Sequence, residues 1–275
     1  MHQFKFPTLA FLFICLAVSA GCEEIIDVGV PDAGPRLVVD ASIEWQKNRD
    51  GQQQTIRLKE STAYFSDQLD VAVVGASVSV VKDDDGQRFE FSDQNNGDYT
   101  TDEFIPELQQ SYTLEIEYEG KSYRANETLM PVNPINRVEQ TLEGGFGDDE
   151  IQLKVYFNDP AEAHNFYFCQ FSPENMSLAT WVILDDEFSD GNENFMEFDH
   201  EDLTEGVNVP ISLHGISQAY YNYINQLLEQ TDDNGPFATT PSQLKGNCYN
   251  PNDPDEEVLG YFRLGEVDKT IYVIE

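Results

Sequence analysis

The sequence predicts a mainly β protein with two domains. Residues 36–130 contain short runs in which apolar and polar residues alternate, and turn residues separate these runs. A second series of runs follows a proline-containing segment, in residues 135–275. The chain has 275 residues with 40% hydrophobic content, which is enough to build cores in both regions. We expect the first domain to be an immunoglobulin-like or transthyretin-like sandwich.

The first domain is expected to contain about seven short strands. Turn residues such as Glu119-Gly120 separate the runs, and Pro131 and Pro134 end the series because proline lacks the amide that a sheet requires. The expected strands are residues 37–39, 55–58, 76–81, 88–91, 98–100, 112–118 and 121–125.

The second domain is expected to combine a sheet with one amphipathic helix near residues 217–231. Ser217 can cap the start of this helix, and Asn234-Gly235-Pro236 ends it. Tyr221 lies off the apolar face of this helix. The residues of that face follow helical spacing and should pack on the sheet; they are Ile216, Ala219, Tyr220, Tyr223, Ile224, Leu227 and Leu228. The expected strands are residues 151–157, 165–171, 180–184, 207–213, 259–264 and 270–274.

Residues 1–21 are typical of an export signal. Lys5 precedes an apolar run over residues 9–18 that is too short to span a membrane, and small residues follow it. Ser19-Ala20-Gly21-Cys22 resembles the bacterial lipobox, which implies that Cys22 carries fatty acyl chains such as palmitate and anchors the protein to a membrane. Residues 22–35 then form a tether. A plain secretory signal with an unmodified cysteine is the alternative.

The net charge of the chain excludes nucleic acid as a partner, and its acidic segments suggest calcium as a ligand. The chain has 15 Lys and Arg against 51 Asp and Glu, a net charge of −36, and would be repelled by nucleic acid. Acidic residues crowd into segments 83–86, 185–192 and 250–257, where carboxylates and turns can supply oxygen ligands to calcium. Asp83, Asp84 and Asp85 are calcium candidates on this ground; the alternative is a solvated acidic surface.

No arrangement of residues predicts a catalytic site. The sequence has no G-x-S-x-G turn, no H-E-x-x-H pair, no phosphate-binding G-x-x-x-x-G-K-[ST] loop and no C-x-x-C motif, so we do not expect an enzyme or a resident cofactor. A secreted hydrolase is the least favoured alternative. Cys169 and Cys248 either form one disulfide or stay separate thiols.

Several segments together resemble the Bacteroidota outer-membrane lipoproteins classed as domain of unknown function 4249. They are residues 37–41, 75–78, 112–114, 158–161 (Asn-Asp-Pro-Ala), 185–192, 216–221, 234–237 with Pro241, 246–247 and 258–262. The resemblance implies a cell-surface lipoprotein of the outer membrane that helps a TonB-dependent receptor capture a nutrient, a small molecule or peptide of unknown identity. No catalytic residue comes with it.

We expect the contact surface in the loops of the second domain, at Asp185, Asp186, Asp190, Asn192, Asp233 and Phe237. A calcium-binding structural or adhesive envelope protein is the alternative function.

Overall fold

A computed structural model describes residues 34–63, 66, 71–145, 150–231 and 244–275. Residues 35–275 form one compact unit, described here by itself. Strands dominate it, so the predicted mainly β class is confirmed. None of the helices in the described ranges has the length and hydropathy of a membrane span.

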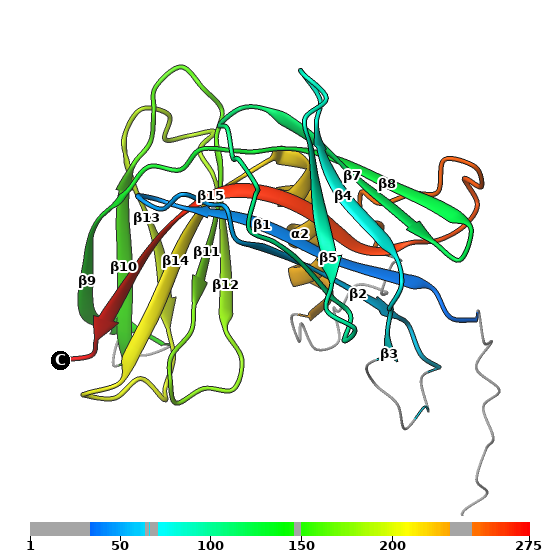
Figure 1. The fold of residues 1–275 in the computed structure, drawn as a ribbon. Coiled ribbons are helices and arrows are strands. Elements are labelled where there is room, and N and C mark those ends of the chain that lie inside the picture. Colours follow the sequence, from blue (N-terminus) through cyan, green and yellow to red (C-terminus); the bar gives the residue numbers. More distant parts are fainter. Residues whose placement is uncertain (1–33, 64–65, 67–70, 146–149, 232–243) are drawn as a thin grey trace, which may run out of the picture. The chain divides into compact units, whose positions relative to one another are not determined.

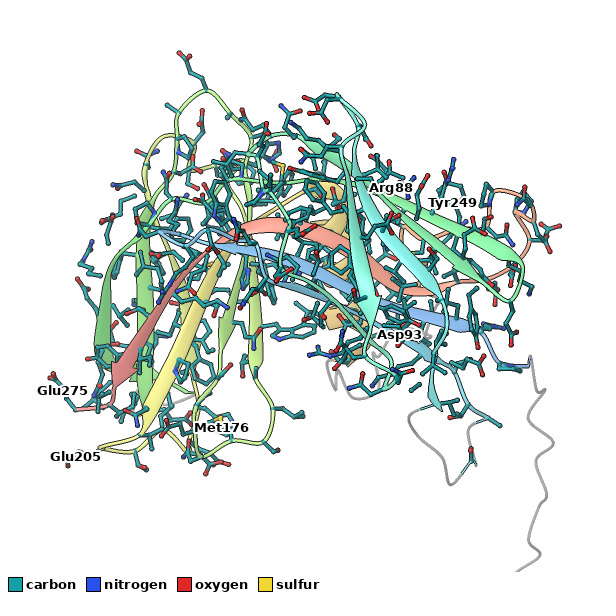
Figure 2. The ribbon with its side chains drawn as sticks, in the orientation of Figure 1. Arg88, Asp93, Met176, Glu205, Tyr249 and Glu275 are labelled. Carbon is teal, nitrogen blue, oxygen red and sulfur yellow. The ribbon has the colours of Figure 1, made fainter. Side chains whose placement is uncertain are left out.

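The N-terminal strands form a sandwich around one apolar core. Inward residues of β1 and β2, such as Ile43 and Leu58, face Val80, Phe91 and Leu114 of the opposite layer, and all of them are buried. We call this cluster the N-terminal core. Figure 2 shows Arg88 and Asp93 at the two ends of β5, the strand that pairs with both β4 and β6. The strands are β1 (Leu37–Gln46), β2 (Gln54–Glu60), β3 (Val71–Ala72), β4 (Ser77–Lys82), β5 (Arg88–Asp93), β6 (Asp98–Thr101), β7 (Ser111–Tyr118) and β8 (Lys121–Thr128).

The rest of the chain builds a second core. A three-stranded sheet ordered β13-β10-β9 contributes Leu153, Val155 and Phe157 from β10, and Phe171 and Leu213 come from β11 and β14. We call this cluster the C-terminal core. The elements are β9 (Ile135–Gly144), β10 (Glu150–Asn158), β11 (Phe166–Phe171), β12 (Thr180–Asp185), β13 (Glu193–Asp199), β14 (Asn208–Ile216), α2 (Gln218–Thr231) and β15 (Leu259–Val273).

One long strand joins the two halves of the protein, which are the parts built around the N-terminal core and the C-terminal core. β15 pairs with β1 in parallel and with β14 in antiparallel orientation, inside a 12-stranded sheet ordered β12-β11-β14-β15-β1-β2-β6-β5-β4-β7-β8, with β3 paired to β2 (Figure 1). Residues 259–264 and 270–274 are therefore one strand and not two. β15 also crosses the predicted boundary between the regions, because Phe262 and Leu264 of the second region lie in the N-terminal core.

The predicted helix is confirmed and packs on the outer face of the sheet. The Ser217 hydroxyl accepts a hydrogen bond from the Tyr220 amide at 3.1 Å, as expected of a cap. Tyr220 and Ile224 are buried against Phe166, Phe168 and Tyr261. Two details differ from the prediction: Ala219 is exposed, and the ring of Tyr221 packs on that of Phe166 with centroids 5.1 Å apart.

Candidate functional site

The acidic segment 185–192 lies against residues that precede β11. Phe166 and Asp185 are opposite each other in the β11–β12 hairpin, so the chain before Phe166 and the chain after Asp185 leave the sheet side by side. The Asp186 amide donates to the Asn165 carbonyl at 3.3 Å, and the Asn165 amide donates to the Asp186 carboxylate at 2.9 Å. The register of one hairpin therefore brings together two segments that are distant in sequence.

Three carboxylates meet at this place. Asp159, Asp186 and Asp190 each present an oxygen within 4.8 Å of the others, and Asp159 and Asp186 are only 6% and 1% exposed. Burial raises the pKa of Asp186, and the nearby Asp159 carboxylate raises it further. Two buried carboxylates this close repel each other, so a bound cation or proton would stabilise the group.

Hydrogen bonds hold Asp159 in position. Its carboxylate accepts from the Tyr167 hydroxyl and, at 3.0 Å, from the Gly191 amide. Gly191 has a φ of 72° and a β-carbon there would lie 2.8 Å from that of Ala161, so glycine lets the loop approach closely. Asn192 closes the same turn, because its carbonyl accepts from the Asp159 amide at 2.9 Å.

His164 adds a nitrogen to the group. Its Nε2 lies 2.5 Å from Asp185 and 3.5 Å from Asp186, and the hydrogen bond to Asp185 raises the pKa of His164. A hollow of about 250 Å³ opens here, lined by Glu162, His164, Asp186, Glu187 and Asp190 among others. Hard oxygen ligands favour calcium, and the imidazole beside Asp185 and Asp186 can also serve a transition metal.

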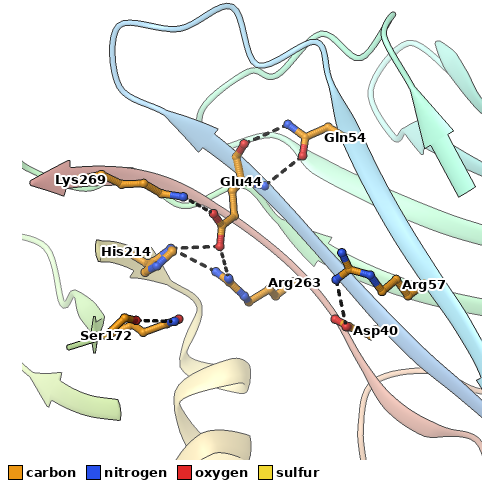
Figure 3. Close-up of polar contacts among 9 residues, drawn as sticks. Asp40, Glu44, Gln54, Arg57, Ser172, His214, Arg263 and Lys269 are labelled. Carbon is orange, nitrogen blue, oxygen red and sulfur yellow. Dashed lines mark hydrogen bonds and ion pairs between the residues drawn. The ribbon is translucent and has the colours of Figure 1, made fainter. Parts of the chain in front are cut away.

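A second polar cluster, which the sequence did not reveal, lies where β1, β14 and β15 meet (Figure 3). The Glu44 carboxylate accepts from Arg263 at 2.7 Å and from Lys269 at 2.9 Å. Burial acts to raise the pKa of Glu44, but Arg263, His214 and Lys269 together lower it to about 2. Burial and the Arg263 charge lower the pKa of His214 to about 3, so His214 is neutral at pH 7.

Neighbouring groups fix this second cluster on both sides. The Gln54 side chain donates to the Glu44 carbonyl at 2.9 Å and accepts from the Glu44 amide at 3.2 Å. The Arg263 guanidinium lies 5.8 Å and 5.5 Å from the ring centroids of Phe168 and Tyr220. Because every charge has a partner, and because His214 and Arg263 are buried where β14 and β15 meet, we assign the cluster to the junction between the halves rather than to ligand binding.

Comparison with known proteins decides the family. The family described as a domain of unknown function, DUF4249, matches residues 23–271. The chain belongs to this family. The membership of DUF4249 inferred from short segments is therefore confirmed over residues 23–271. No curated protein shows significant similarity to the chain.

Solved structures resemble this DUF4249 protein only distantly. A two-domain fibronectin type III segment of chicken tenascin has 13% identity and a TM-score of 0.22, covering 66% of this chain and 90% of its own. A DUF4785 family protein from Legionella pneumophila has 10% identity and a TM-score of 0.26, with coverage of 64% and 52%. A cytokine receptor complex has 10% identity and a TM-score of 0.24, with coverage of 66% and 85%. TM-scores this low give no basis for transferring function.

The calcium candidates Asp83, Asp84 and Asp85 of the DUF4249 chain interact with other side chains of the protein. Asp83 accepts from Thr113 at 2.8 Å and from Asn126 at 2.7 Å, and the buried Lys82 ammonium lies 3.4 Å from Asp84 and 3.5 Å from Asp85. Within the described residues these three do not form a group with metal-ligand spacing. Asp84 and Asp85 balance the charge of Lys82, and Asp83 is held by neutral side chains.

The two cysteines of this DUF4249 member do not form the disulfide considered from the sequence. Both are free and buried, Cys169 in the C-terminal core and Cys248 in the N-terminal core. Burial raises the pKa of both thiols, that of Cys248 to about 12. Cys22, Asp233 and Phe237 lie outside the described residues.

Proposed function

We propose that this protein is a lipid-anchored accessory of a TonB-dependent receptor at the outer face of the outer membrane, where it binds the receptor, its nutrient ligand, or both. One observation carries the proposal: the family match begins at residue 23, directly after Cys22, the last residue of the lipobox-like Ser19-Ala20-Gly21-Cys22. This start supports a mature protein that begins at Cys22.

Anchoring has a physical consequence for partner binding. Fully extended, residues 22–34 span at most about 45 Å, so the folded unit stays near the membrane surface. Confinement to that layer raises the effective concentration of the lipoprotein around a receptor, so that weak contacts suffice for association.

Mass spectrometry of the amino terminus and purification from membranes test the proposal together. Wild-type protein should carry acyl mass on Cys22 and should co-purify with an outer-membrane receptor, whereas Cys22→Ala should carry no acyl mass and leave the membrane fraction. Wild-type protein with an unmodified amino terminus, or anchored protein that brings down no receptor under several nutrient conditions, would contradict the proposal.

A second candidate function is calcium binding by an envelope protein, favoured by the group of Asp159, Asp186 and Asp190. A cation that binds only the folded state stabilises it by about 2.7 kcal/mol at a hundredfold excess over Kd. Calcium should therefore raise the melting temperature of the wild type relative to chelator. Asp190→Asn should abolish this increase, and Asp202→Asn, an exposed acid outside the group, should keep it. Equal melting with calcium and chelator removes this candidate.

A further inference from the structure

The two sheets in the described part of the chain have four edge strands between them, and these strands differ in charge. β12 and β8 end the 12-stranded sheet, and β13 and β9 end the three-stranded sheet. Edge strands expose unpaired backbone groups, and proteins usually protect them with charged residues or by covering them. Three of the edges follow this rule: β8 carries Lys121 and Arg124, β9 carries Arg137, Glu139 and Glu143, and β13 carries Glu193, Glu197 and Asp199.

β8 is also partly covered. The Arg124 amide donates to the Tyr249 carbonyl at 2.8 Å, and the Tyr249 amide donates to the Arg124 carbonyl at 2.9 Å. Charge and an added bridge therefore protect the edge of the 12-stranded sheet that lies opposite β12.

β12 has neither the charges of the other edges nor a backbone bridge like that at β8, although part of it lies close to β13 of the facing sheet. It reads Thr-Trp-Val-Ile-Leu before its final Asp185, with no charged residue among the first five. Across the described ranges, the only backbone partner of these five residues is β11. Large apolar side chains are exposed at both ends, Leu178 at 81% and Phe188 at 94%, and Trp181 within the strand is 37% exposed.

We propose that β12 is the docking edge of this protein, where an extended, apolar segment of the receptor carrying lysine or arginine at one end adds as a further strand. This inference rests on the proposed function and names the contact surface. Main-chain hydrogen bonds would supply affinity, and contacts with alternate side chains such as Trp181 would supply specificity.

Charge selects the occupant of the edge. Asp185 ends the strand and Glu187 and Asp190 follow it, so one end of the edge is acidic and favours a basic segment. A second copy of this chain fits poorly, because each copy carries a net charge of −36 and would bring the same acids to the edge.

Two matched positions test the proposal in isolated outer membranes. Trp181 on β12 and Phe195 on β13 are aromatic residues of edge strands, 37% and 45% exposed. Trp181→Lys adds a positive charge to the proposed edge and should lower the amount of co-purifying receptor about tenfold, whereas Phe195→Lys should change it less than about twofold. Melting curves of both variants establish that each is folded.

Photo-crosslinking provides a readout that does not depend on stability. With p-benzoylphenylalanine in place of Trp181, we expect a crosslink to an extended receptor segment flanked by lysine or arginine, and the same group in place of Phe195 should give none. Hydrogen exchange in the complex should slow at alternate amides of β12.

The outcomes separate this inference from the proposed function. A receptor that co-purifies equally with wild type and Trp181→Lys, or that crosslinks equally from both positions, overturns the β12 inference and leaves the proposed function intact. A crosslink from position 181 to a second copy of the chain overturns it as well. Wild-type anchored protein without any receptor removes both.

Discussion

Replacing Glu44 with glutamine tests whether the buried charge cluster stabilises the junction of the two halves. Glutamine keeps the size and hydrogen-bonding capacity of the side chain but removes the charge that Arg263 and Lys269 contact at 2.7 Å and 2.9 Å. Arg263, whose side chain is only 8% exposed, would then lack its counter-ion.

The pKa of Glu44 sets the size and the pH dependence of the effect. It falls from an ordinary 4.5 to about 2 in the folded protein, which corresponds to about 3 kcal/mol of unfolding free energy at pH 7. Because the folded pKa is the lower one, this stabilisation is present above pH 4.5 and is lost as the pH falls towards 2. At pH 3 about 1.5 kcal/mol should remain.

Urea unfolding of wild type and Glu44→Gln at pH 7 and pH 3 measures the difference. Carboxylates away from the cluster titrate equally in both proteins, so the difference between them reports on Glu44 and on His214, whose pKa depends on it. Glu90→Gln is a matched control on β5, because Glu90 is 65% exposed and lies 3.9 Å from Arg88. This control should change the unfolding free energy by no more than about 0.5 kcal/mol at either pH.

The reasoning is refuted if the gap between wild type and Glu44→Gln is the same at pH 7 and pH 3. Such a result would mean that the ionisation of Glu44 is not coupled to folding, and that any loss of stability comes from packing alone.

Three further predictions concern buried positions. Burial raises the pKa of Glu127, so its charge costs stability above the unfolded pKa, and Glu127→Gln should melt at pH 7 no lower than wild type. A β-carbon at Gly215 would overlap the carbonyl oxygen of Pro131, so Gly215→Ala should lose at least about 3 kcal/mol in urea unfolding, and wild-type stability would contradict the close approach. Maleimide should label Cys169 and Cys248 only after unfolding, because both thiols are buried; rapid labelling of the native protein would show otherwise.

Most strands with one buried face were predictable from sequence because burial alternates with residue number, although β13, which alternates in the same way, was not among the expected strands. β5 reads Arg-Phe-Glu-Phe-Ser-Asp with both phenylalanines buried, and the runs in residues 36–130 behave in the same way. β9 was missed because only one of its ten side chains is buried and its sequence is rich in charge. A strand without a clear apolar face has little period-two signal.

β15 was divided in the prediction for a different reason. Polar residues interrupt its apolar pattern where residues 131–135 cross the strand. The Glu266 carboxylate accepts from the Val132 amide at 3.0 Å, and the Asp268 carboxylate accepts from the Ile135 amide at 2.8 Å. Glu266 and Asp268 thus accept hydrogen bonds from backbone amides of the crossing segment. This explains why polar residues, which in the sequence resemble a loop, lie within a continuous strand.

The acidic site was half predictable. Asp186 and Asp190 lie in a segment whose density of acids and turns is visible in the sequence. Asp159 and His164 were missed as members because only the register of the β11–β12 hairpin and the fold of residues 186–192 bring them to Asp186. No local signal connects these residues.

The Glu44 cluster was beyond sequence reasoning, because Glu44 and Arg263 are 219 residues apart and meet through a parallel pairing. The same pairing gives the charges a structural purpose. Along β15, Phe262 and Leu264 face the N-terminal core, whereas Arg263 lies on the opposite face with Glu44. A slip of β15 by one residue would turn Arg263 into that apolar core, where no carboxylate faces it. Because an unpaired buried guanidinium is far more costly than a misplaced apolar side chain, the cluster selects the observed register of β1 and β15.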